Sequence, residues 1–186
     1  MKLILPKTLV PDSEINGGIF FLAGPIKGGD DWQKDCCELL EQKIGPDVTI
    51  VNPCRYAEDH PLYRYKMAGN ENYFPRQTLW ERHYLARASV GGCILFFCPC
   101  QSLTNPRKDN QPYARDTYGE LGEWRGRLMN NPNLNVVVGA ATGFPGYSVI
   151  QTNFNEALKT HFHIHVSLDK TVDAAIEKSH LAIIPE

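Results

Sequence analysis

Residues 19–32 read IFFLAGPIKGGDDW, and this stretch decides the fold class. The first five residues are apolar, which is typical of a short buried strand, and the glycines after them predict a turn. A helix is expected over 31–44, where apolar residues recur near one face and Asp30 with Gln33 resembles a capping box. A buried strand that leads through a short turn into such a helix indicates a parallel sheet with crossover helices.

The same alternation of apolar runs and helical periodicity continues along the chain. Further strands are expected over 48–51, 93–98, 135–138 and 161–166. Four further helices are expected: one that begins near Thr78, one over 117–129, one that ends near Lys159 and one over 169–178. Thr78 with Glu81 could form a capping box at the start of the first of these. The chain therefore has five pairs of a strand and a helix without an internal repeat. We expect its 186 residues to form one domain, 1–186.

Composition and charge exclude several classes of protein. The chain has 19 Lys and Arg against 21 Asp and Glu, a formal charge of −2, so it lacks the basic field that nucleic-acid binding needs. No apolar run approaches transmembrane length, and the N-terminus has too few apolar residues for a secretory signal. We therefore expect a cytoplasmic protein that binds neither membrane nor nucleic acid. The six cysteines include no CxxC pair and are expected to be buried free thiols.

A ligand site is expected at the carboxyl ends of the strands, because open parallel sheets bind ligands there. The loops after residues 23, 51, 98 and 138 should line it. The turn that begins at Gly24 lets the backbone approach a ligand closely. It matches neither a dinucleotide-binding glycine motif nor a phosphate-binding P-loop, and its alternative interpretation is a tight turn without a ligand.

Residues 116–124, DTYGELGEW, open the helix after the third expected strand and its polar loop. In one interpretation they form a capping box, with Thr117 as the N-cap and Glu120 as its partner three residues later. In the other, Glu120 lies in the first helical turn, where the helix dipole and backbone N–H groups favour the ionised carboxylate. An ionised Glu at this edge of the sheet is a candidate nucleophile.

Four motifs follow one another in a defined order: FLAGPI at 21–26, Trp80-Glu81, ILFF at 94–97 and ELG at 120–122. In this order and spacing the chain resembles the nucleoside 2-deoxyribosyltransferases and their relatives. Looser similarity continues through 137–139, 148–151 and 167–169, so the resemblance covers most of the chain.

The resemblance implies a flavodoxin-like, doubly wound, five-stranded parallel sheet with helices on both faces. It also implies a homo-oligomer that transfers 2-deoxyribose between nucleobases in nucleotide salvage, without a metal or organic cofactor. Glu120 would attack the anomeric carbon, and the covalent 2-deoxyribosyl ester would pass the sugar to a second base with retention of configuration. The expected partners are therefore nucleosides and free nucleobases.

The resemblance also implies where substrate is held. The turn at Gly24 would hold the base or the edge of the sugar, and the loop before Glu120 would supply sugar contacts. Trp32 and Trp80 either stack on a base or belong to the core. The expected substrate-binding residues are Gly24, Pro25, Ile26, Asp31, Trp32, Asn52, Trp80, Glu81 and Thr117, with Glu120 and Asp116 as catalytic residues.

The sequence departs from the family's pattern at two positions. Family members commonly have an Ala-Asp pair before the third strand, and this Asp assists the base, whereas this chain has Ala88-Ser89. The donor of a proton to the leaving base is therefore open. Six residues before Glu120, where the family usually has a sugar-binding Asp, stands Ala114, and Asp116 lies four before. Asp116 either substitutes for that Asp or caps the helix.

His161, His163 and His165 alternate with apolar residues, so on a strand all three imidazoles would point to one face. Three His at this spacing can bind a metal, but no acidic partner is near them in the sequence. We favour the alternative, in which this face meets a helix, another subunit or solvent.

Two other functions fit the same sequence. An N-glycoside hydrolase acting on a nucleoside or nucleotide would keep the fold and Glu120 and use water in place of the second base. A nucleotide-binding or scaffold module without turnover would fit if Glu120 only caps its helix. The fold alone does not decide among these functions.

Overall fold

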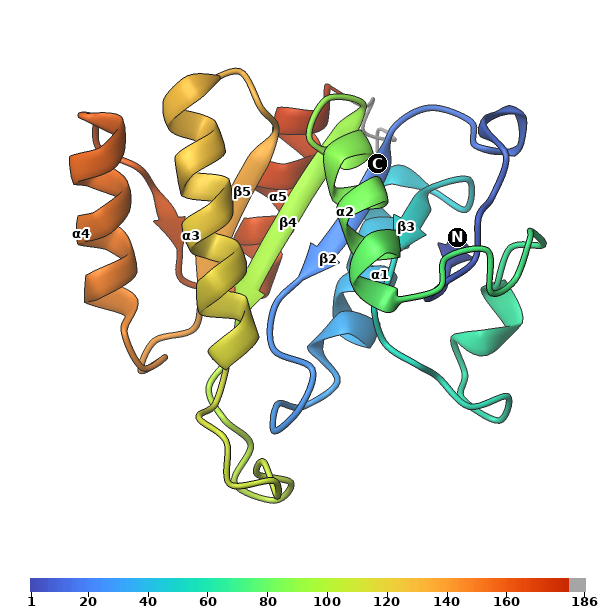
Figure 1. The fold of residues 1–186 in the computed structure, drawn as a ribbon, viewed down its shortest axis with the longest axis horizontal. Coiled ribbons are helices and arrows are strands. Elements are labelled where there is room, and N and C mark those ends of the chain that lie inside the picture. Colours follow the sequence, from blue (N-terminus) through green and yellow to red (C-terminus); the bar gives the residue numbers. More distant parts are fainter. Residues whose placement is uncertain (181–186) are drawn as a thin grey trace.

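Six parallel strands form the centre of the computed structural model, which describes residues 1–180 (Figure 1). The strands are β1 (Lys2–Ile4), β2 (Ile19–Ala23), β3 (Thr49–Val51), β4 (Gly92–Cys98), β5 (Val136–Ala140) and β6 (Ile164–His165), in the spatial order β1-β3-β2-β4-β5-β6. Every residue of β2 and β4 is buried, as expected of strands that are covered on both faces. The predicted parallel α/β sheet is confirmed.

The predicted count of five strands is wrong, because the described part of the sheet has six. The added strand is β1, which pairs in parallel with β3 at the edge of the sheet. Three residues close to Pro6 are too few to show a period of two, so the sequence does not predict this strand. The other five strands keep the order β3-β2-β4-β5-β6, which is the 2-1-3-4-5 order of flavodoxin-like sheets.

Five α-helices in residues 1–180 cover both faces of the sheet, as predicted. They are α1 (Trp32–Ile44), α2 (Gln77–Ala88), α3 (Arg115–Asn130), α4 (Tyr147–Leu158) and α5 (Leu168–Ser179), with two short 3-10 helices, η1 (Asp12–Glu14) and η2 (Tyr63–Tyr65). α2, α3 and α4 share a core with Phe21 and Phe96, whereas α1 and α5 share one with Phe20 and Leu95. Neighbouring strand residues thus face opposite cores, as the pleat requires. Within this range no helix has the length and apolar character needed to cross a bilayer.

The capping box expected at Asp30 and Gln33 does not form. Asp31 is instead the N-cap of α1, and its carboxylate accepts a hydrogen bond from Lys34 N (3.2 Å). The Gln33 side chain turns back toward the preceding loop, where its amide donates to Pro25 O (3.3 Å). The helix still begins within one residue of the expected position.

The other two capping boxes are absent because both helices begin earlier than expected. α2 begins at Gln77 rather than Thr78, and α3 begins at Arg115 rather than Thr117. At neither N-terminus does the N-cap residue form a side-chain capping hydrogen bond. Glu120 therefore lies in the second turn of α3, and the capping interpretation of this residue is wrong.

All six cysteines are free thiols, and all except Cys100 are buried. Burial raises the pKa of each buried thiol, to about 12 for Cys54 and Cys98. A buried thiol whose pKa is raised stays protonated and unreactive near neutral pH. Four of these side chains belong to the two cores, and Cys54 is buried outside them.

Candidate active site

The strand order creates a binding point between β2 and β4. The chain leaves these neighbouring strands toward opposite edges of the sheet, because β2 leads to β3 and β4 leads to β5. Doubly wound sheets bind ligands at such a point, at the carboxyl ends of the strands. A cleft of about 500 Å³ lies there, between residues 26–28 after β2 and 105–109 after β4. A second cleft, of about 600 Å³, lies near the amino ends of β1 and β2, so topology favours the first.

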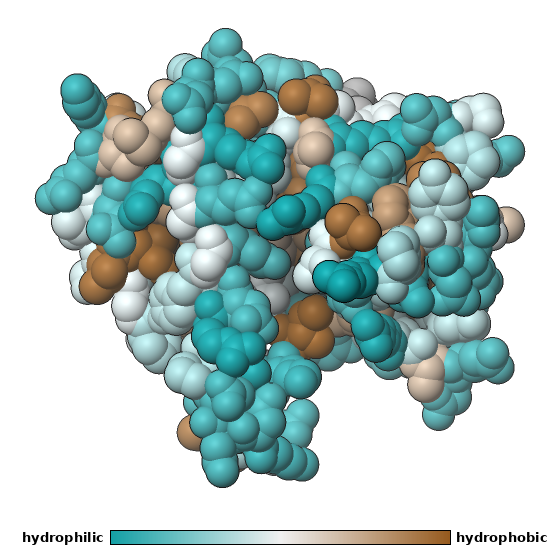
Figure 2. All heavy atoms as spheres, in the orientation of Figure 1, coloured by the Kyte–Doolittle hydropathy of each residue, from teal (hydrophilic) through white to brown (hydrophobic). Residues whose placement is uncertain are grey.

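The loop over 99–114 packs against the glycine turn after β2. Ser102 N donates to Gly28 O (2.8 Å), and a Cβ on Gly28 would lie 2.8 Å from Arg107 N, so this approach requires glycine. The loop projects from the carboxyl edge of the sheet in Figure 1, and its surface is mostly hydrophilic in Figure 2. It therefore covers part of the turn that the sequence assigns to ligand binding.

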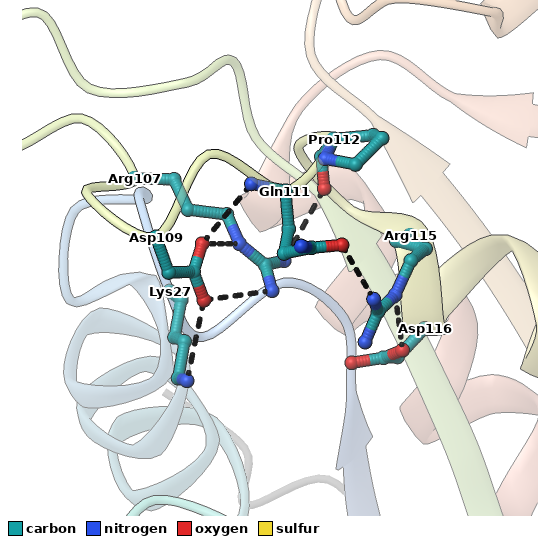
Figure 3. Close-up of polar contacts among 7 residues, drawn as sticks. All are labelled: Lys27, Arg107, Asp109, Gln111, Pro112, Arg115 and Asp116. Carbon is teal, nitrogen blue, oxygen red and sulfur yellow. Dashed lines mark hydrogen bonds and ion pairs between the residues drawn. The ribbon is translucent and has the colours of Figure 1, made fainter.

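An ion-pair cluster holds this loop to the turn (Figure 3). The Asp109 carboxylate accepts a hydrogen bond from Arg107 (Nη2 to Oδ2, 3.1 Å) and lies 3.6 Å from Lys27 Nζ. Hydrogen bonds from Arg107, together with the Lys27 charge, lower the pKa of Asp109 to about 2. The Arg107 guanidinium also donates to Pro112 O (3.2 Å), so one side chain ties three points of the loop region together.

Gly24 and Pro25 form the start of the turn, and the Trp32 side chain packs between this turn and the core. A Cβ on Gly24 would lie 2.2 Å from Phe97 O, and the φ of this residue is 151°, so the position requires glycine. Trp32 Nε1 donates to Pro25 O (2.9 Å), and its ring packs against Phe97 in the core. Trp32 is only 3% exposed, so its place is beneath the turn, whereas Ile26 is exposed and lines the cleft.

Asp31 and Asn52 are joined through Tyr56, and His60 contacts Asp31; the sequence predicts a role for neither Tyr56 nor His60. The Tyr56 hydroxyl accepts from Asn52 Nδ2 (3.3 Å) and donates to Asp31 Oδ1 (3.1 Å). His60 Nε2 lies 3.1 Å from Asp31 Oδ2, and its ring stacks on Tyr56 with 3.9 Å between ring centroids. Asn52 is fully buried, so this network fixes the loop after β3 onto the start of α1. The only signal in the sequence is the run of aromatic and polar residues after Asn52.

Trp80 lies in the core between α2 and the sheet. Its ring packs against Phe21 and Tyr84, and its Nε1 donates to Thr8 O (3.1 Å). The side chain has no exposed surface with which to contact a base. Thr117 is likewise buried, in the first turn of α3.

Glu120 is a half-buried carboxyl group on α3. Within residues 1–180, neither of its oxygens forms a hydrogen bond or an ion pair. Burial, followed by the charges of Glu81, Asp116 and Glu123, raises its pKa to about 7. The expectation of a carboxyl held in its ionised form by the helix N-terminus is therefore wrong. The cause is the early start of α3, which leaves this residue beyond the unpaired N–H groups of the first turn.

Glu120 and the glycine turn flank the carboxyl end of β4. The Glu120 charge contributes to the raised pKa of Cys98, the last residue of the strand. Gly24 lies close to the backbone of Phe97, the residue before Cys98. The two elements that the sequence assigns to the site thus reach the same end of the same strand, although Glu120 is not among the residues that line the 500 Å³ cleft.

Glu81 and Asp116 differ in their surroundings. Glu81 is half-buried on α2, and burial, together with the Asp116 charge, raises its pKa, although a hydrogen bond from Gln77 and the Arg55 charge oppose this rise. Asp116 is exposed on α3, and its carboxylate accepts from Arg115 Nε (3.0 Å), as Figure 3 shows. Both carboxylates raise the pKa of Glu120, so all three lie in the same electrostatic environment.

The expected histidine strand is shorter than predicted. β6 contains only Ile164 and His165, so His161 and His163 precede it. The ring centroids of His163 and His165 lie 4.5 Å apart, and burial lowers the pKa of His165. No group of three or more His, Cys, Asp or Glu side chains in the described part of the chain could hold a metal ion.

No protein-family model matches this chain, and no curated protein matches it. The fold and the side chains at the carboxyl edge of the sheet are therefore the features that indicate a function. Among these, the position and environment of Glu120 are the most specific.

Proposed function

We propose that this protein is a nucleoside 2-deoxyribosyltransferase that exchanges nucleobases on 2-deoxyribonucleosides through a covalent ester on Glu120. One observation carries the proposal: a half-buried carboxyl at the carboxyl edge of the sheet has no protein partner within residues 1–180 and a pKa raised to about 7. A carboxyl group in such surroundings is typical of a functional site, because burial without a partner is otherwise unfavourable.

The environment of Glu120 supports chemistry at an anomeric carbon. Cleavage of an N-glycosidic bond develops positive charge on the sugar, and a nearby carboxylate becomes more stable as that charge forms. A carboxylate with few hydrogen bonds retains its nucleophilic electron pairs for the sugar. The second base then attacks the ester from the opposite side, and the configuration of the starting nucleoside is retained.

Incubation of 2′-deoxyinosine with and without adenine tests the proposal. A transferase produces 2′-deoxyadenosine in the presence of adenine. Free 2-deoxyribose in both reactions, without a new nucleoside, would assign the chain to the N-glycoside hydrolases instead. Absence of both products with purine and pyrimidine deoxynucleosides would leave the non-catalytic binding module.

Glu120→Gln is the matching variant, because it keeps the size of the side chain and removes its charge. We expect the exchange rate to fall by about three orders of magnitude or more, since the covalent route is lost. Glu38→Gln is the control, because Glu38 is an exposed glutamate on α1 that pairs with Lys34 (2.8 Å) and is not among the charges that shift the pKa of Glu120. A sugar ester on Glu120, detected by mass spectrometry with a slow 2-fluoro nucleoside, would support the proposal directly.

The proposed activity also defines the expected setting of the protein. The reaction belongs to nucleotide salvage in the cytoplasm and needs no metal or organic cofactor. Self-association into a homo-oligomer is part of the same proposal, and size-exclusion chromatography with light scattering tests it.

A further inference from the structure

We propose that Glu81 donates the proton to the leaving base and that Gln77 is the residue that positions it. The inference rests on the proposed function. Glu81 lies one helical turn after Gln77 on α2, and Glu120 lies on α3. Both helices begin at the carboxyl end of the sheet and pack on the same face of it (Figure 1), and the Glu81 charge acts on Glu120.

Gln77 holds the Glu81 side chain in place, and both the nitrogen and the oxygen of its side-chain amide form hydrogen bonds. Its Nε2 donates to Glu81 Oε1 (2.9 Å) and to Pro53 O (3.0 Å), and its Oε1 accepts from Arg55 Nε (2.8 Å). Two acceptors on one side and a cationic donor on the other fix which end of the amide is nitrogen. Within residues 1–180 the second carboxyl oxygen of Glu81 has no partner, so it is the atom left to donate a proton.

Ser89 is in the wrong place for this task. It is the C-cap of α2, and its hydroxyl donates to Ala86 O (2.8 Å) near the amino end of β4. A helix rises about 1.5 Å per residue, so Ser89 lies roughly 18 Å along the axis from Gln77. Asp116 is exposed and paired with Arg115. Glu123 is paired with Arg127 (2.7 Å), so Glu81 is the carboxyl group that remains among those whose charges act on Glu120.

The charges around the two glutamates allow them to share one proton. Glu81 faces Arg55 from the loop after β3 and Asp116 and Glu120 from α3. Glu120 faces Glu81, Asp116 and Glu123, and its charge also reaches Cys98. Two neighbouring carboxylates cannot easily both ionise, so the pair retains a proton toward neutral pH. In the free protein burial keeps this proton mainly on Glu120, whereas Gln77 and Arg55 favour ionised Glu81. The reactive form has the proton on Glu81 and the negative charge on Glu120, and the positive charge that develops on the sugar stabilises this arrangement.

The step balances without any further reactant. The bond between the anomeric carbon and the base nitrogen breaks, its electron pair leaves with the base, and Glu81 gives this base its proton. An oxygen of Glu120 forms a new bond to the anomeric carbon. In the second half-reaction a nitrogen of the incoming base attacks this carbon, the ester bond returns its electrons to Glu120, and Glu81 takes the proton that the base loses.

A substrate that needs no proton separates the two roles. 7-Methyl-2′-deoxyguanosine already carries a positive charge on its base, so the base leaves without protonation. We expect Glu81→Gln to lower the rate about 10²- to 10⁴-fold with 2′-deoxyinosine and less than about threefold with the methylated substrate. Glu120→Gln should lower both rates. If Glu81→Gln lost activity equally with both substrates, or lost none, the role of Glu81 would be overturned and the proposed transferase activity would stand. Full activity of Glu120→Gln would overturn the proposed function.

Gln77→Met tests the positioning role. The variant loses the hydrogen bond that favours ionised Glu81, so the pKa of Glu81 rises further. We expect the rate with 2′-deoxyinosine to fall about tenfold, and its alkaline limb to move to higher pH, because this limb requires protonated Glu81. The methylated substrate should react at nearly the normal rate.

Gln151→Met is the matched control, because the Gln151 amide makes a comparable hydrogen bond to Asn155 Oδ1 (3.1 Å) on α4. It should leave both rates and the pH profile unchanged. Equal losses with both substrates in Gln77→Met, without a shift of the alkaline limb, would show that Gln77 only stabilises the fold and would overturn its assigned role.

Discussion

At the scale of single residues, the burial of Glu120 destabilises the folded protein at high pH, where its carboxyl group is ionised. Its pKa is raised from 4.5 to about 7, mainly by burial and then by Glu81. A carboxyl group whose pKa is higher in the folded than in the unfolded chain contributes to the free energy of unfolding only while it is protonated. Its contribution to the free energy of unfolding is therefore complete below pH 4.5 and is lost as the pH rises toward 7. This is the opposite of the usual behaviour of a paired carboxylate.

Glu120→Gln should therefore stabilise the protein at pH 8 relative to the unchanged chain, by on the order of 1–2 kcal/mol, and by much less at pH 5. Gln carries no charge, so it removes both the cost of burying a carboxylate and the repulsion from Glu81. Urea unfolding at the two pH values measures the difference, with Glu38→Gln as the exposed control. A loss of stability at pH 8 would show that Glu120 has a stabilising partner.

The sequence predicted the backbone of the site better than its side chains. The turn at Gly24 follows from local spacing alone, and the structure places it as expected. The side-chain roles of Trp32, Trp80 and Asn52 depend on partners far along the chain, such as Pro25 O, Thr8 O and Tyr56. A single sequence does not show these partners, because hydrogen bonds between distant segments follow from tertiary packing and not from residue spacing.

At the scale of elements, the loop over 99–114 depends on few contacts for its position. Asp109 accepts from Arg107 and also pairs with Lys27, whereas the rest of the loop contributes little to the two cores. Surface ion pairs stabilise weakly, so the loop is expected to open locally without unfolding of the sheet. Opening of this loop would expose the turn at Gly28.

Asp109→Asn should make this loop open more often, since the Arg107 and Lys27 cations lose their anionic partner. Trypsin cleaves after Arg107 and Lys108, so the rate of cleavage in the native protein should rise about threefold to tenfold. Asp47→Asn removes an exposed carboxylate that pairs with Lys2 (3.2 Å) elsewhere, and it is the control. Equal cleavage rates in both variants would contradict a holding role for Asp109.

The histidines at 161, 163 and 165 are not expected to bind a metal that the activity needs. In the described part of the chain no set of side chains is arranged to hold a metal, and the proposed chemistry uses carboxyl groups. Treatment with a chelator should therefore leave base exchange unchanged, and added zinc should not increase it. Activity that is lost to the chelator and restored by zinc would contradict this expectation and would point to His163 and His165.

Element prediction succeeded where apolar runs are long and failed where they are short. β2 and β4, with five and seven residues, were predicted at or within one residue of their bounds. β1 and β6, with three and two residues, are defined by pairing with a neighbouring strand, and the sequence misses the first and overextends the second. The starts of α1, α2 and α3 differ by one or two residues from the expected starts, because the expected capping boxes do not form.

At the scale of the whole molecule, one sheet joins the two cores. β2 and β4 send neighbouring side chains to opposite faces, so Phe20 and Phe21 belong to different cores although they are adjacent. A change in one core therefore acts on strands that also support the other. The chain over 1–180 is expected to unfold as one cooperative unit, in keeping with the predicted single domain.

Leu40→Ala tests this expectation across the sheet. Leu40 is fully buried on α1, so the change should lower the free energy of unfolding by about 2–5 kcal/mol. If the two cores unfold together, native-state hydrogen exchange should show the same loss for the most protected amides of α3, which packs on the opposite face. Leu103→Ala is the control, because this side chain is 98% exposed, and it should change neither. Loss of protection in α1 and α5 alone would mean that the two faces unfold independently, and that the chain behaves as two folding units around a shared sheet.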